Sequence, residues 1–476
     1  MPLILPGNVG SATAATGFNV ANSLRFNSGS SDRLNKTLGT PTNNLKWTYS
    51  FWIKRSKLGE EVAITEALND SQNKGIILFR SDDKLEILDL ISDSYVMQKK
   101  TNRVFRDTAS WYHIVFSNDS TAGSPDLKIY VNGVEETSFA TDNEYSQNQA
   151  GSFNSALANH IGASASSRFS NCYFSQFVFI DGLALAADQF GEFDSDSAIW
   201  KPIDVSGLTF GDNGFFLKFE ESGTGTDANG MGADSSGNTN HFAVNNLTAV
   251  DQSTDTCTNN FATWNSLIKT TATFSEGNLK YAQPGSNPVF GSLSTIGVTS
   301  GKWYAELNYT SGSSHKLVLG VADETFQNGN TTASYDLGKS GTTSSIAYVV
   351  NTGAYRINNS NTSWGSGGGD GDIINMAIDR DNGKIYFGVN GTWGNSSNPA
   401  SNSGGIPTTA LDSSTNWFWG ITADTSGTSD VGELNFGSPS YSESGGETDG
   451  NGYGNFAHAV PTNYYSLNTK NLAEYG

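Results

Sequence analysis

Cysteine, methionine and charged residues are all scarce in this sequence of 476 residues. It holds 2 Cys and 4 Met, and charged residues make up 16% of the chain. Cys172 and Cys257 lie far apart in sequence and do not resemble a disulfide framework, a redox pair or a metal site, so we expect two buried structural thiols. No apolar run approaches the roughly 20 residues that cross a bilayer, which argues against membrane insertion.

Composition favours short strands over helices. Glycine is abundant, with 53 residues, and the aromatic share is 12%. Helical proteins need more alanine, leucine, glutamate and lysine, whereas aromatic and β-branched residues with many turn formers are typical of strands joined by tight turns. The chain is too long for one compact core, so we predict more than one domain.

The charge balance is strongly acidic. There are 47 acidic and 27 basic residues, a formal net charge of -20. Such a surface repels phosphate backbones and anionic lipid, which argues against nucleic-acid and membrane partners. Mutual repulsion between copies would keep the protein soluble.

Apolar and alternating runs predict a first β-sandwich over residues 21–202, preceded by an N-terminal arm at 1–20. The dipeptide Asn132-Gly133 accepts the positive φ angles of a tight hairpin turn, and a short helical turn is expected at Ala186–Phe190. The main predicted strands are SLRF (23–26), WTYSFWIKR (47–55), KGIILFR (74–80), LEILDLI (85–91), WYHIVFS (111–117) and the strands of DLKIYVNGVEETSF (126–139).

A second sandwich is predicted over residues 276–440, after a connecting β/loop segment at 203–275 and before a C-terminal tail at 441–476. Only sheet-on-sheet packing buries so many half-apolar strands without helices, so we predict an all-β chain of two jelly-roll β-sandwiches in tandem. The predicted strands are GKWYAELNY (301–309), KLVLGVAD (316–323), SIAYVVN (345–351), INMAIDR (374–380), GKIYFGVNG (383–391), NWFWGITA (416–423) and VGELNFG (431–437).

Both halves carry family motifs. The motifs YSFWIKR, WYHIVFSND, LKIYVNGV and FSQFVFIDGLALAADQFGEF give residues 21–195 a resemblance to concanavalin A-like lectins of the laminin-G type. TSGKWYAEL, LVLGVADETF, INMAIDRDNGKIYFGVNG and WFWGITAD make residues 290–437 similar to SPRY domains, which share that sandwich. The resemblance implies two concanavalin A-like sandwiches.

The order of motifs along the whole chain resembles a structural protein of tailed bacteriophages. It runs from MPLILPGNV through FGEFDSDSAIWKP, GFFLKFEES, DSSGNTNHFAVNN and NNFATWNSL to a final YYSLNTKNL. This resemblance implies a virion component: a tail fibre, a receptor-binding protein or a head decoration. The N-terminus makes a poor signal peptide, so we expect assembly in the host cytoplasm and an exterior place on the particle.

Catalytic groups are not arranged in any recognised pattern. Concanavalin A-like glucanases place carboxylates alternately along one strand, so that acid and nucleophile face one cleft. The nearest approaches here, Glu60-Glu61 and Glu86 with Asp89, lack that spacing. We expect no catalytic residue and no cofactor, with glycan hydrolysis as the alternative from another functional class.

Metal-ligand patterns are also missing. The five histidines never pair at metal-ligand spacing, and we expect His113 to be a strand residue that faces its neighbours. Related lectin-like domains hold Ca²⁺ with an Asp-Glu pair on the closing strand, where this sequence has Ser175-Gln176. That departure argues against a calcium site, and Asp181 reads as a turn residue, so no metal is expected.

Three aromatic residues in the second domain are the candidate ligand contacts. Sugars bind an aromatic platform with amide and hydroxyl partners nearby, and the loops AYRINNSNTSW (354–364) and NGTWGNSSN (390–398) supply those residue types. We therefore single out Tyr355, Trp364 and Trp393. The alternative is that each packs beneath its own loop, since large aromatic side chains are usually mostly buried.

The sequence thus predicts an exterior virion protein that adheres without catalysis to a host-surface glycan or protein. The alternative within this class is a decoration protein whose sandwiches grip neighbouring virion subunits. A weak contact gains avidity from many copies, so we expect a homo-oligomer or a high copy number.

Overall fold

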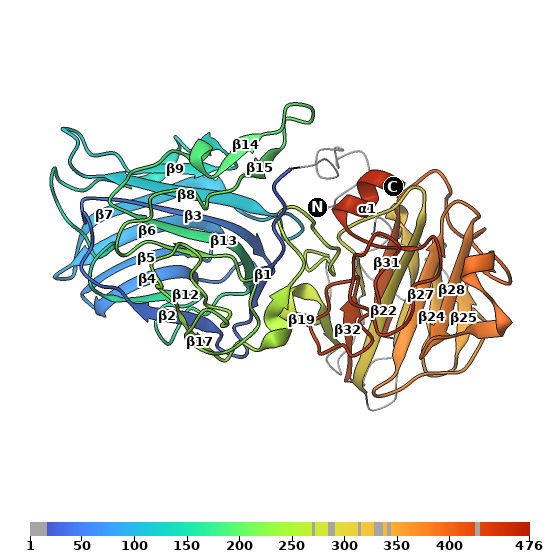
Figure 1. Cartoon of the computed structure of the whole chain (residues 1–476). Helices are drawn as coiled ribbons and strands as arrows, with labels where there is room; N and C mark the ends of the chain where they lie inside the picture. Colours follow the sequence, from blue (N-terminus) through green and yellow to red (C-terminus); the bar gives the residue numbers. More distant parts are fainter. Residues whose placement is uncertain are drawn as a thin grey trace. The chain divides into compact units, whose positions relative to one another are not determined.

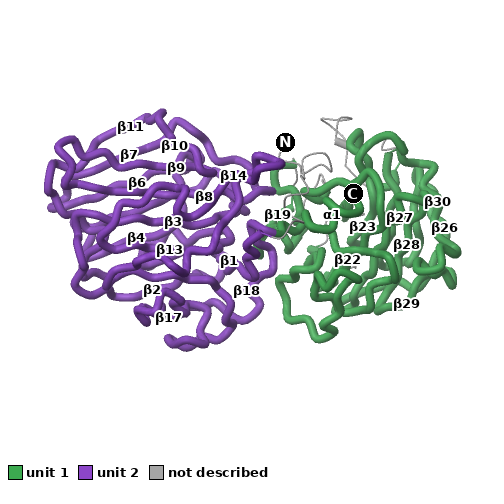
Figure 2. The backbone as a smooth tube through the Cα atoms, turned by 45° about the horizontal axis from the view of Figure 1, so that its top comes forward, with its two compact units in different colours: residues 1–14, 259–476 green, residues 15–258 purple. Residues whose placement is uncertain are grey.

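The computed structural model describes residues 17–268, 272–283, 291–312, 316–327, 337–339, 344–423 and 429–476. They form two compact units that divide between residues 258 and 259 (Figure 2). Each unit is a sandwich of two antiparallel sheets (Figure 1). The predicted all-β tandem sandwich fold is confirmed. The predicted N-terminal arm lies outside the described residues except for its last four.

One sheet of the first unit, here the β3 sheet, has the strand order β10-β9-β8-β3-β13-β1-β18, with β16 paired to β13. Neighbouring strands are antiparallel throughout. The bounds are β1 (Ser23–Phe26), β3 (Lys46–Arg55), β8 (Tyr112–Asp119), β9 (Lys128–Val131), β10 (Val134–Glu135), β13 (Cys172–Asp181), β16 (Phe215–Leu217) and β18 (Gln252–Ser253).

The other sheet of the first unit, here the β6 sheet, has the order β11-β7-β6-β5-β4-β12-β2-β17. The strands predicted at 74–80 and 85–91 correspond to β5 and β6, but β4 and β7, which flank them, were not predicted. The bounds are β2 (Arg33–Thr37), β4 (Val62–Asp70), β5 (Asn73–Phe79), β6 (Lys84–Ile91), β7 (Ser94–Val104), β11 (Phe139–Asn143), β12 (Ala158–Ile161) and β17 (Ala243–Asn245).

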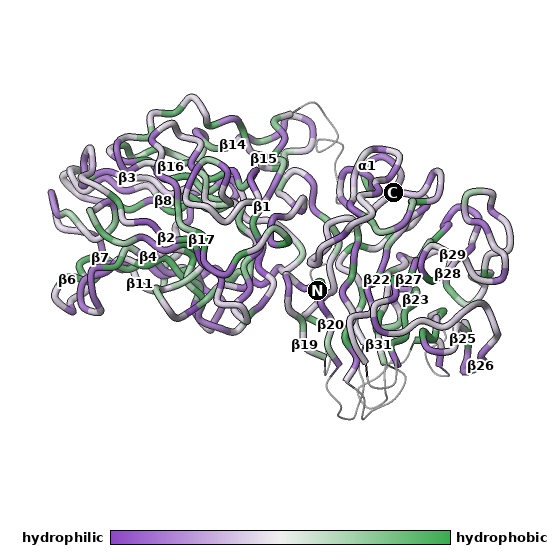
Figure 3. Tube along the Cα trace, turned by 60° about the horizontal axis from the view of Figure 1, so that its bottom comes forward, coloured by the Kyte–Doolittle hydropathy of each residue, from purple (hydrophilic) through white to green (hydrophobic). Residues whose placement is uncertain are grey.

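The core of the first unit lies between these sheets. Alternate residues of each strand point inward, and Figure 3 shows green apolar segments among the strands of this unit. Rings pack edge to face or stacked in this core, and Phe51 stacks on Phe177 with centroids 4.9 Å apart. The core includes Leu24, Phe26, Trp47, Tyr49, Phe51, Ile77, Phe79, Ile87, Phe116, Phe174, Phe177, Phe179 and Phe215.

The outer face of the β3 sheet is also covered. Residues of β13 are buried along the whole strand, because its outward side chains pack against the segment that follows. That segment contains the 3-10 turn Ala187–Gln189, close to the predicted helical turn, and the hairpin β14 (Gly191–Phe193) and β15 (Trp200–Pro202). A second apolar cluster joins the outer face of the β3 sheet to this segment. It consists of Val115, Val178, Ile180, Ala187, Phe190, Val205, Phe210 and Phe216. The outer face of the β3 sheet is thus covered by residues of the same unit.

The hairpin predicted at Asn132-Gly133 is confirmed. Asn132 has φ 49° and Gly133 has φ 78°, and they join β9 to β10. A Cβ atom on Gly133 would lie 2.3 Å from the indole ring of Trp200. Glycine is therefore needed for the turn and for the close approach of the β14–β15 hairpin.

His113 lies beneath that hairpin as a buried strand residue. Its ring stacks between Trp52, 4.8 Å away, and Trp200, 5.8 Å away. Trp200 Nε1 donates a hydrogen bond to His113 Nδ1 at 3.0 Å, so the ring proton is on Nε2 and is donated to Ser50 Oγ at 2.9 Å. Burial lowers the pKa of His113 to about 3, and the imidazole is neutral at physiological pH.

Asp181 joins the loops at one end of the first unit. Its carboxylate accepts hydrogen bonds from the backbone nitrogens of Thr42, Asn43 and Asn213 and from Asn154 Nδ2, at 2.6, 3.2, 3.0 and 2.7 Å. Burial by itself would raise the pKa of Asp181, but these donors outweigh it and leave the pKa below its usual value. The turn residue expected from the sequence is the centre of a loop network.

The segment expected to connect the domains is divided between them. Residues up to 258 belong to the first unit, where β16, β17 and β18 extend its sheets. Residues from 259 onward belong to the second unit, where β19 (Thr273–Ser275) pairs with β20 (Lys280–Gln283). The aromatic anchors predicted in this segment are buried, since Phe261 and Trp264 are almost inaccessible.

The second unit contains two further sheets. The β22 sheet has the order β19-β20-β32-β22-β27-β28-β29, with β30 paired to β28 and β33 to β22; the β23 sheet has the order β21-β31-β23-β24-β25-β26. Bounds are β21 (Ser292–Leu293), β22 (Lys302–Gly312), β23 (Leu317–Asp323), β24 (Ser345–Val349), β25 (Ala354–Ile357), β26 (Ser360–Ser363), β27 (Ile373–Asp379), β28 (Lys384–Val389), β29 (Thr392–Trp393), β30 (Ile406–Pro407), β31 (Trp417–Ala423), β32 (Asp430–Asn435) and β33 (Tyr465–Ser466).

The C-terminal segment packs back onto the second unit. Tyr464 and Leu467 are buried, and β33 pairs in parallel with β22. It ends in the helix α1 (Thr469–Tyr475), which the sequence did not predict. Asn468 caps this helix by accepting a hydrogen bond from Asn471 N, which satisfies one of the free N–H groups of the first turn.

Glu306 anchors this C-terminal segment to β22. The carboxylate is fully buried and accepts hydrogen bonds from Ala457 N at 2.8 Å, His458 N at 2.9 Å and the Tyr304 hydroxyl at 2.7 Å. Burial raises the pKa of Glu306 to about 7. The folded protein therefore binds a proton more tightly than the unfolded chain between pH 4.5 and pH 7.

We expect Glu306 to make the second unit less stable as pH rises. The contribution of Glu306 to the free energy of unfolding is fully favourable below pH 4.5 and is lost as the pH rises through 7. The difference between the two limits is about 3 kcal/mol. Urea unfolding at a series of pH values checks this. In Glu306→Gln the pH dependence over that window should become flatter, even though the variant is less stable overall. An unchanged slope in Glu306→Gln would contradict the assignment.

Candidate functional site

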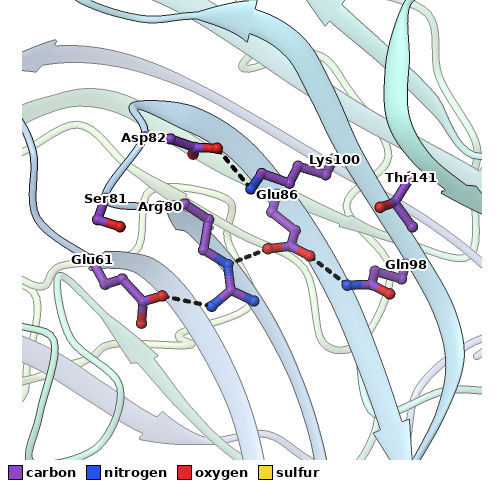
Figure 4. Close-up of a pocket in the computed structure, with 8 residues that line it drawn as sticks. All are labelled: Glu61, Arg80, Ser81, Asp82, Glu86, Gln98, Lys100 and Thr141. Atoms are coloured by element: carbon purple, nitrogen blue, oxygen red, sulfur yellow. Dashed lines mark hydrogen bonds and ion pairs between the residues drawn. The ribbon is translucent and has the colours of Figure 1, made fainter.

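A polar depression of about 440 Å³ opens on the outer face of the β6 sheet. Its floor is formed by side chains of β6, β7 and β11, and one wall comes from the turn between β5 and β6 (Figure 4). None of its lining residues is aromatic, and all are polar. They are Glu61, Arg80, Ser81, Asp82, Glu86, Gln98, Lys100 and Thr141.

Strand register brings these side chains together. Thr141 of β11 lies opposite Lys100 of β7, and Lys100 lies opposite Glu86 of β6. Direct cross-strand partners point to the same face, so the three form a row across the sheet. Gln98 is two residues before Lys100 and therefore shares this face. Arg80 follows the end of β5 and reaches back over the row.

Arg80 organises the centre of the depression. Its Nε donates to Glu86 Oε2, and its NH1 donates to Glu61 Oε1 at 2.8 Å (Figure 4). Glu86 is only 2% exposed, and its other oxygen accepts from Gln98 Nε2 at 2.6 Å. Planar charged and amide groups are thus held in fixed orientations by charge-assisted hydrogen bonds.

The charges of the depression are nearly balanced. Lys100 Nζ lies 2.9 Å from Asp82 Oδ2, and Arg168 Nε lies 3.1 Å from Glu61 Oε2 at the margin. The hydrogen bond from Arg80 lowers the pKa of Glu61, and the one from Lys100 lowers the pKa of Asp82. Both carboxylates are therefore ionised at neutral pH and poorly suited to act as a general acid, which must carry a proton.

Several polar atoms remain available to a ligand. Within the described residues, the hydroxyls of Ser81 and Thr141 form no side-chain hydrogen bond with the rest of the protein, and Gln98 uses only its amide nitrogen. Hydroxyl, amide and guanidinium groups can donate to or accept from a ligand rich in hydroxyls. The arrangement is suited to binding such a ligand, with each polar group already oriented.

An exposed aromatic side chain lies on the same face. Tyr95 of β7 is opposite Leu90 of β6, and Leu90 packs on the apolar residues of this outer face. Tyr95 is 55% exposed. The ring can stack on the apolar face of a sugar beside the polar depression, as aromatic side chains combine apolar area with a polar edge.

The three aromatic residues singled out from the sequence lie in the second unit, close to one another but differently exposed. Trp364 is 6% exposed and donates from Nε1 to the Phe387 carbonyl at 2.9 Å, so the structure places it in the interior. Its ring meets that of Tyr355 edge to face at 6.0 Å, and Gly394 packs on its other side. Tyr355 and Trp393 are half-buried, and Trp393 packs against Tyr304.

The sequence hypothesis therefore missed the depression of the first unit. Glu61 and Glu86 were considered only as catalytic groups and set aside for their spacing. A signal was present in KLEI (84–87), where the polar residues Lys84 and Glu86 alternate with the apolar residues Leu85 and Ile87 and mark outward positions of a half-buried strand. Alternation alone did not show that these outward positions meet in one row.

The positions considered for metals have structural roles. Ser175 and Gln176 form a β-bulge in β13, and Gln176 has φ 48°. Among the described residues, no group of three or more His, Cys, Asp or Glu side chains is placed to hold a metal ion. Cys172 is buried as expected, and burial raises its pKa to about 12, whereas Cys257 is partly exposed. No helix in the described ranges is long and apolar enough to cross a bilayer.

Solved structures resemble parts of this chain at low identity. The SPRY domain of human HERC1 is 14% identical over 36% of this chain and 96% of its own, with a TM-score of 0.29. A putative carbohydrate binding protein from Bacteroides ovatus is 14% identical over 48% of this chain and 59% of its own, with a TM-score of 0.32. A SAP-like pentraxin from Limulus polyphemus is 16% identical over 36% of this chain and 82% of its own, with a TM-score of 0.27.

Sequence families give a more specific result for the first unit. No curated protein matches the chain. The model of the concanavalin A-like lectin/glucanases superfamily matches residues 27–186, which span β2 to β13 and hold every residue of the polar depression. The first unit therefore carries a domain similar to the concanavalin A-like lectin/glucanases superfamily.

Proposed function

We propose that this protein is a non-catalytic adhesion protein that binds a neutral glycan in the polar depression of the first unit. The observation that carries the proposal is the set of fixed, charge-balanced polar groups around Arg80 in an open depression of the β6 sheet. A charged ligand would meet charges of both signs, whereas hydroxyl groups can donate to the carboxylates and accept from Arg80 and Lys100. The family match supports a glycan as the ligand, because its description names lectins and glucanases, two classes that bind glycans.

Binding without hydrolysis fits the state of the carboxylates. Glu61 and Glu86 both accept hydrogen bonds from Arg80. A glycosidase needs one carboxyl that holds a proton and a second that attacks or activates water. With the pKa of Glu61 lowered by Arg80, that residue does not meet the first requirement.

We further propose that the protein acts on the exterior of a tailed-bacteriophage particle and contacts a host-surface glycan. The order of motifs from MPLILPGNV to YYSLNTKNL supports this location. A particle presents many copies, so a weak glycan contact would gain avidity, and other virion proteins would be its partners in assembly. The net charge of -20 would keep such copies apart in solution.

The direct test is binding of the full chain to an array of neutral and acidic oligosaccharides. We expect signals on neutral glycans that Arg80→Ala removes, and no new reducing ends when the chain is incubated with the bound glycan. Binding restricted to acidic glycans, or no binding to any of them, would contradict the proposal. Release of reducing ends would identify a hydrolase. Immunogold imaging of intact phage particles tests the exterior location separately.

A further inference from the structure

A second group of polar side chains lies on the outer face of the β6 sheet, on β4, β12 and β2. Strand register places Glu66 opposite His160, and His160 opposite Asn35. Arg33 is two residues before Asn35 and so points to the same face. Asn245 of the edge strand β17 donates from Nδ2 to Asn35 Oδ1 at 2.6 Å.

This group shares a cross-strand row with the depression. From Glu66 the row continues through Ile76 of β5 and Leu88 of β6 to Gln98 of β7. Because direct cross-strand partners share a face, Gln98 and His160 both belong to this outer surface. The row is polar at its two ends and apolar in its middle, where Ile76 and Leu88 are buried.

Three buried atoms in the second group have no hydrogen-bond partner among the described residues. They are Glu66 Oε2, His160 Nδ1 and Arg33 Nε. Glu66 is 1% exposed, and only its Oε1 is satisfied, by the Ser164 hydroxyl at 2.7 Å. Each unsatisfied buried polar atom costs about 1–3 kcal/mol, so polar groups supplied from outside the chain would stabilise this neighbourhood.

The chemistry of these atoms defines the class of ligand. Glu66 Oε2 accepts, Arg33 Nε donates, and His160 Nδ1 can do either according to its tautomer. A hydroxyl group both donates and accepts, so neighbouring hydroxyls of a sugar can satisfy all three. Charges are again of both signs, which matches the depression at the other end of the row.

We propose that Arg33, Glu66 and His160 form a second subsite, and that the ligand is a linear neutral glycan lying across the strands between this subsite and the depression. The inference rests on the proposed function and specifies its ligand. Gln98 and His160 are separated by four strand spacings of about 4.8 Å, roughly 19 Å in all. That span is longer than a disaccharide, so the second subsite selects for chain length.

The test compares a disaccharide and a hexasaccharide of the same neutral series, chosen from the strongest array signals, by isothermal titration calorimetry with the full chain. We expect His160→Ala and Arg33→Ala each to weaken hexasaccharide binding about tenfold, as for the loss of one or two hydrogen bonds. Disaccharide affinity should stay unchanged, which also shows that the variants are folded. Glu66→Gln keeps the shape of the side chain and should also weaken hexasaccharide binding.

The outcomes separate this inference from the proposed function. If Arg80→Ala abolishes binding of both sugars while His160→Ala and Arg33→Ala leave the hexasaccharide unaffected, the depression binds alone and the second subsite is refuted. Equal losses for disaccharide and hexasaccharide would also refute it, because they would indicate a general effect. If the unmodified chain binds neither sugar, the proposed function fails and the inference fails with it.

Discussion

Asp181→Ala is expected to lower the free energy of unfolding of the first unit by about 4 kcal/mol. The side chain is 2% exposed and accepts hydrogen bonds from Thr42, Asn43, Asn154 and Asn213. Alanine leaves these donors without their acceptor, and each such loss costs about 1 kcal/mol or more. Three separate loops also lose their common attachment. Urea unfolding followed by tryptophan fluorescence measures the change.

The pH dependence of this effect has a definite sign. The pKa of Asp181 is lower in the folded protein than in the unfolded chain. The stabilisation that Asp181 provides is therefore fully present at pH values above its pKa in the unfolded chain. It is lost as the pH falls through the pKa that Asp181 has in the folded protein. The difference in the free energy of unfolding between the original protein and Asp181→Ala should therefore become smaller in acid. The exposed Asp188 gives a matched control, and Asp188→Ala should change stability by less than about 0.5 kcal/mol. Equal effects of the two substitutions would contradict the network.

Arg80→Ala should weaken glycan binding about 100-fold, equivalent to about 2.7 kcal/mol. The substitution removes the donors of Arg80, which leaves Glu61 held only by Arg168 and Glu86 only by Gln98 among the described residues. Arg80→Lys keeps the charge but lacks the planar fork that holds two carboxylates at once, so we expect an intermediate loss. Titration calorimetry with the neutral oligosaccharide that gives the strongest array signal measures both.

A matched control separates the local effect from the loss of one positive charge. Lys128 lies on β9 of the β3 sheet, is 40% exposed and forms ion pairs with Asp126 and Glu135. Lys128→Ala changes the net charge by the same amount and should leave glycan affinity within twofold. Circular dichroism checks that Arg80→Ala is folded, since Glu86 is buried. If Arg80→Ala binds the glycan with the same affinity as the original protein, the depression is not the glycan-binding site.

Much of the fold could be predicted because its central strands carry strong local signals. β3, β8 and β13 are rich in aromatic and β-branched residues, which are enriched in strands. The turn at Asn132-Gly133 needs positive φ angles and is recognisable from two residues. The strands β4 and β7 were not recognised, because alanine, lysine, asparagine and glutamate have low strand propensity and these strands depend on pairing within the sheet.

The candidate site was missed for a related reason. Lys100, Glu86 and Thr141 are distant in sequence and meet only through the register of β6, β7 and β11. Register depends on which strands pair, and local composition does not reveal it. The aromatic residues of the second unit were more conspicuous, yet the interior position of Trp364 follows from its hydrogen bond to Phe387, a contact between residues 23 positions apart.

The most direct measurement is a crystal structure of the full chain with a bound neutral oligosaccharide. We expect difference density for sugar rings over the outer face of the β6 sheet, with hydroxyls in hydrogen-bond contact with Arg80, Gln98 and Thr141. Sugar density at Trp393 in the second unit, with an empty depression at a concentration that saturates binding in solution, would contradict it.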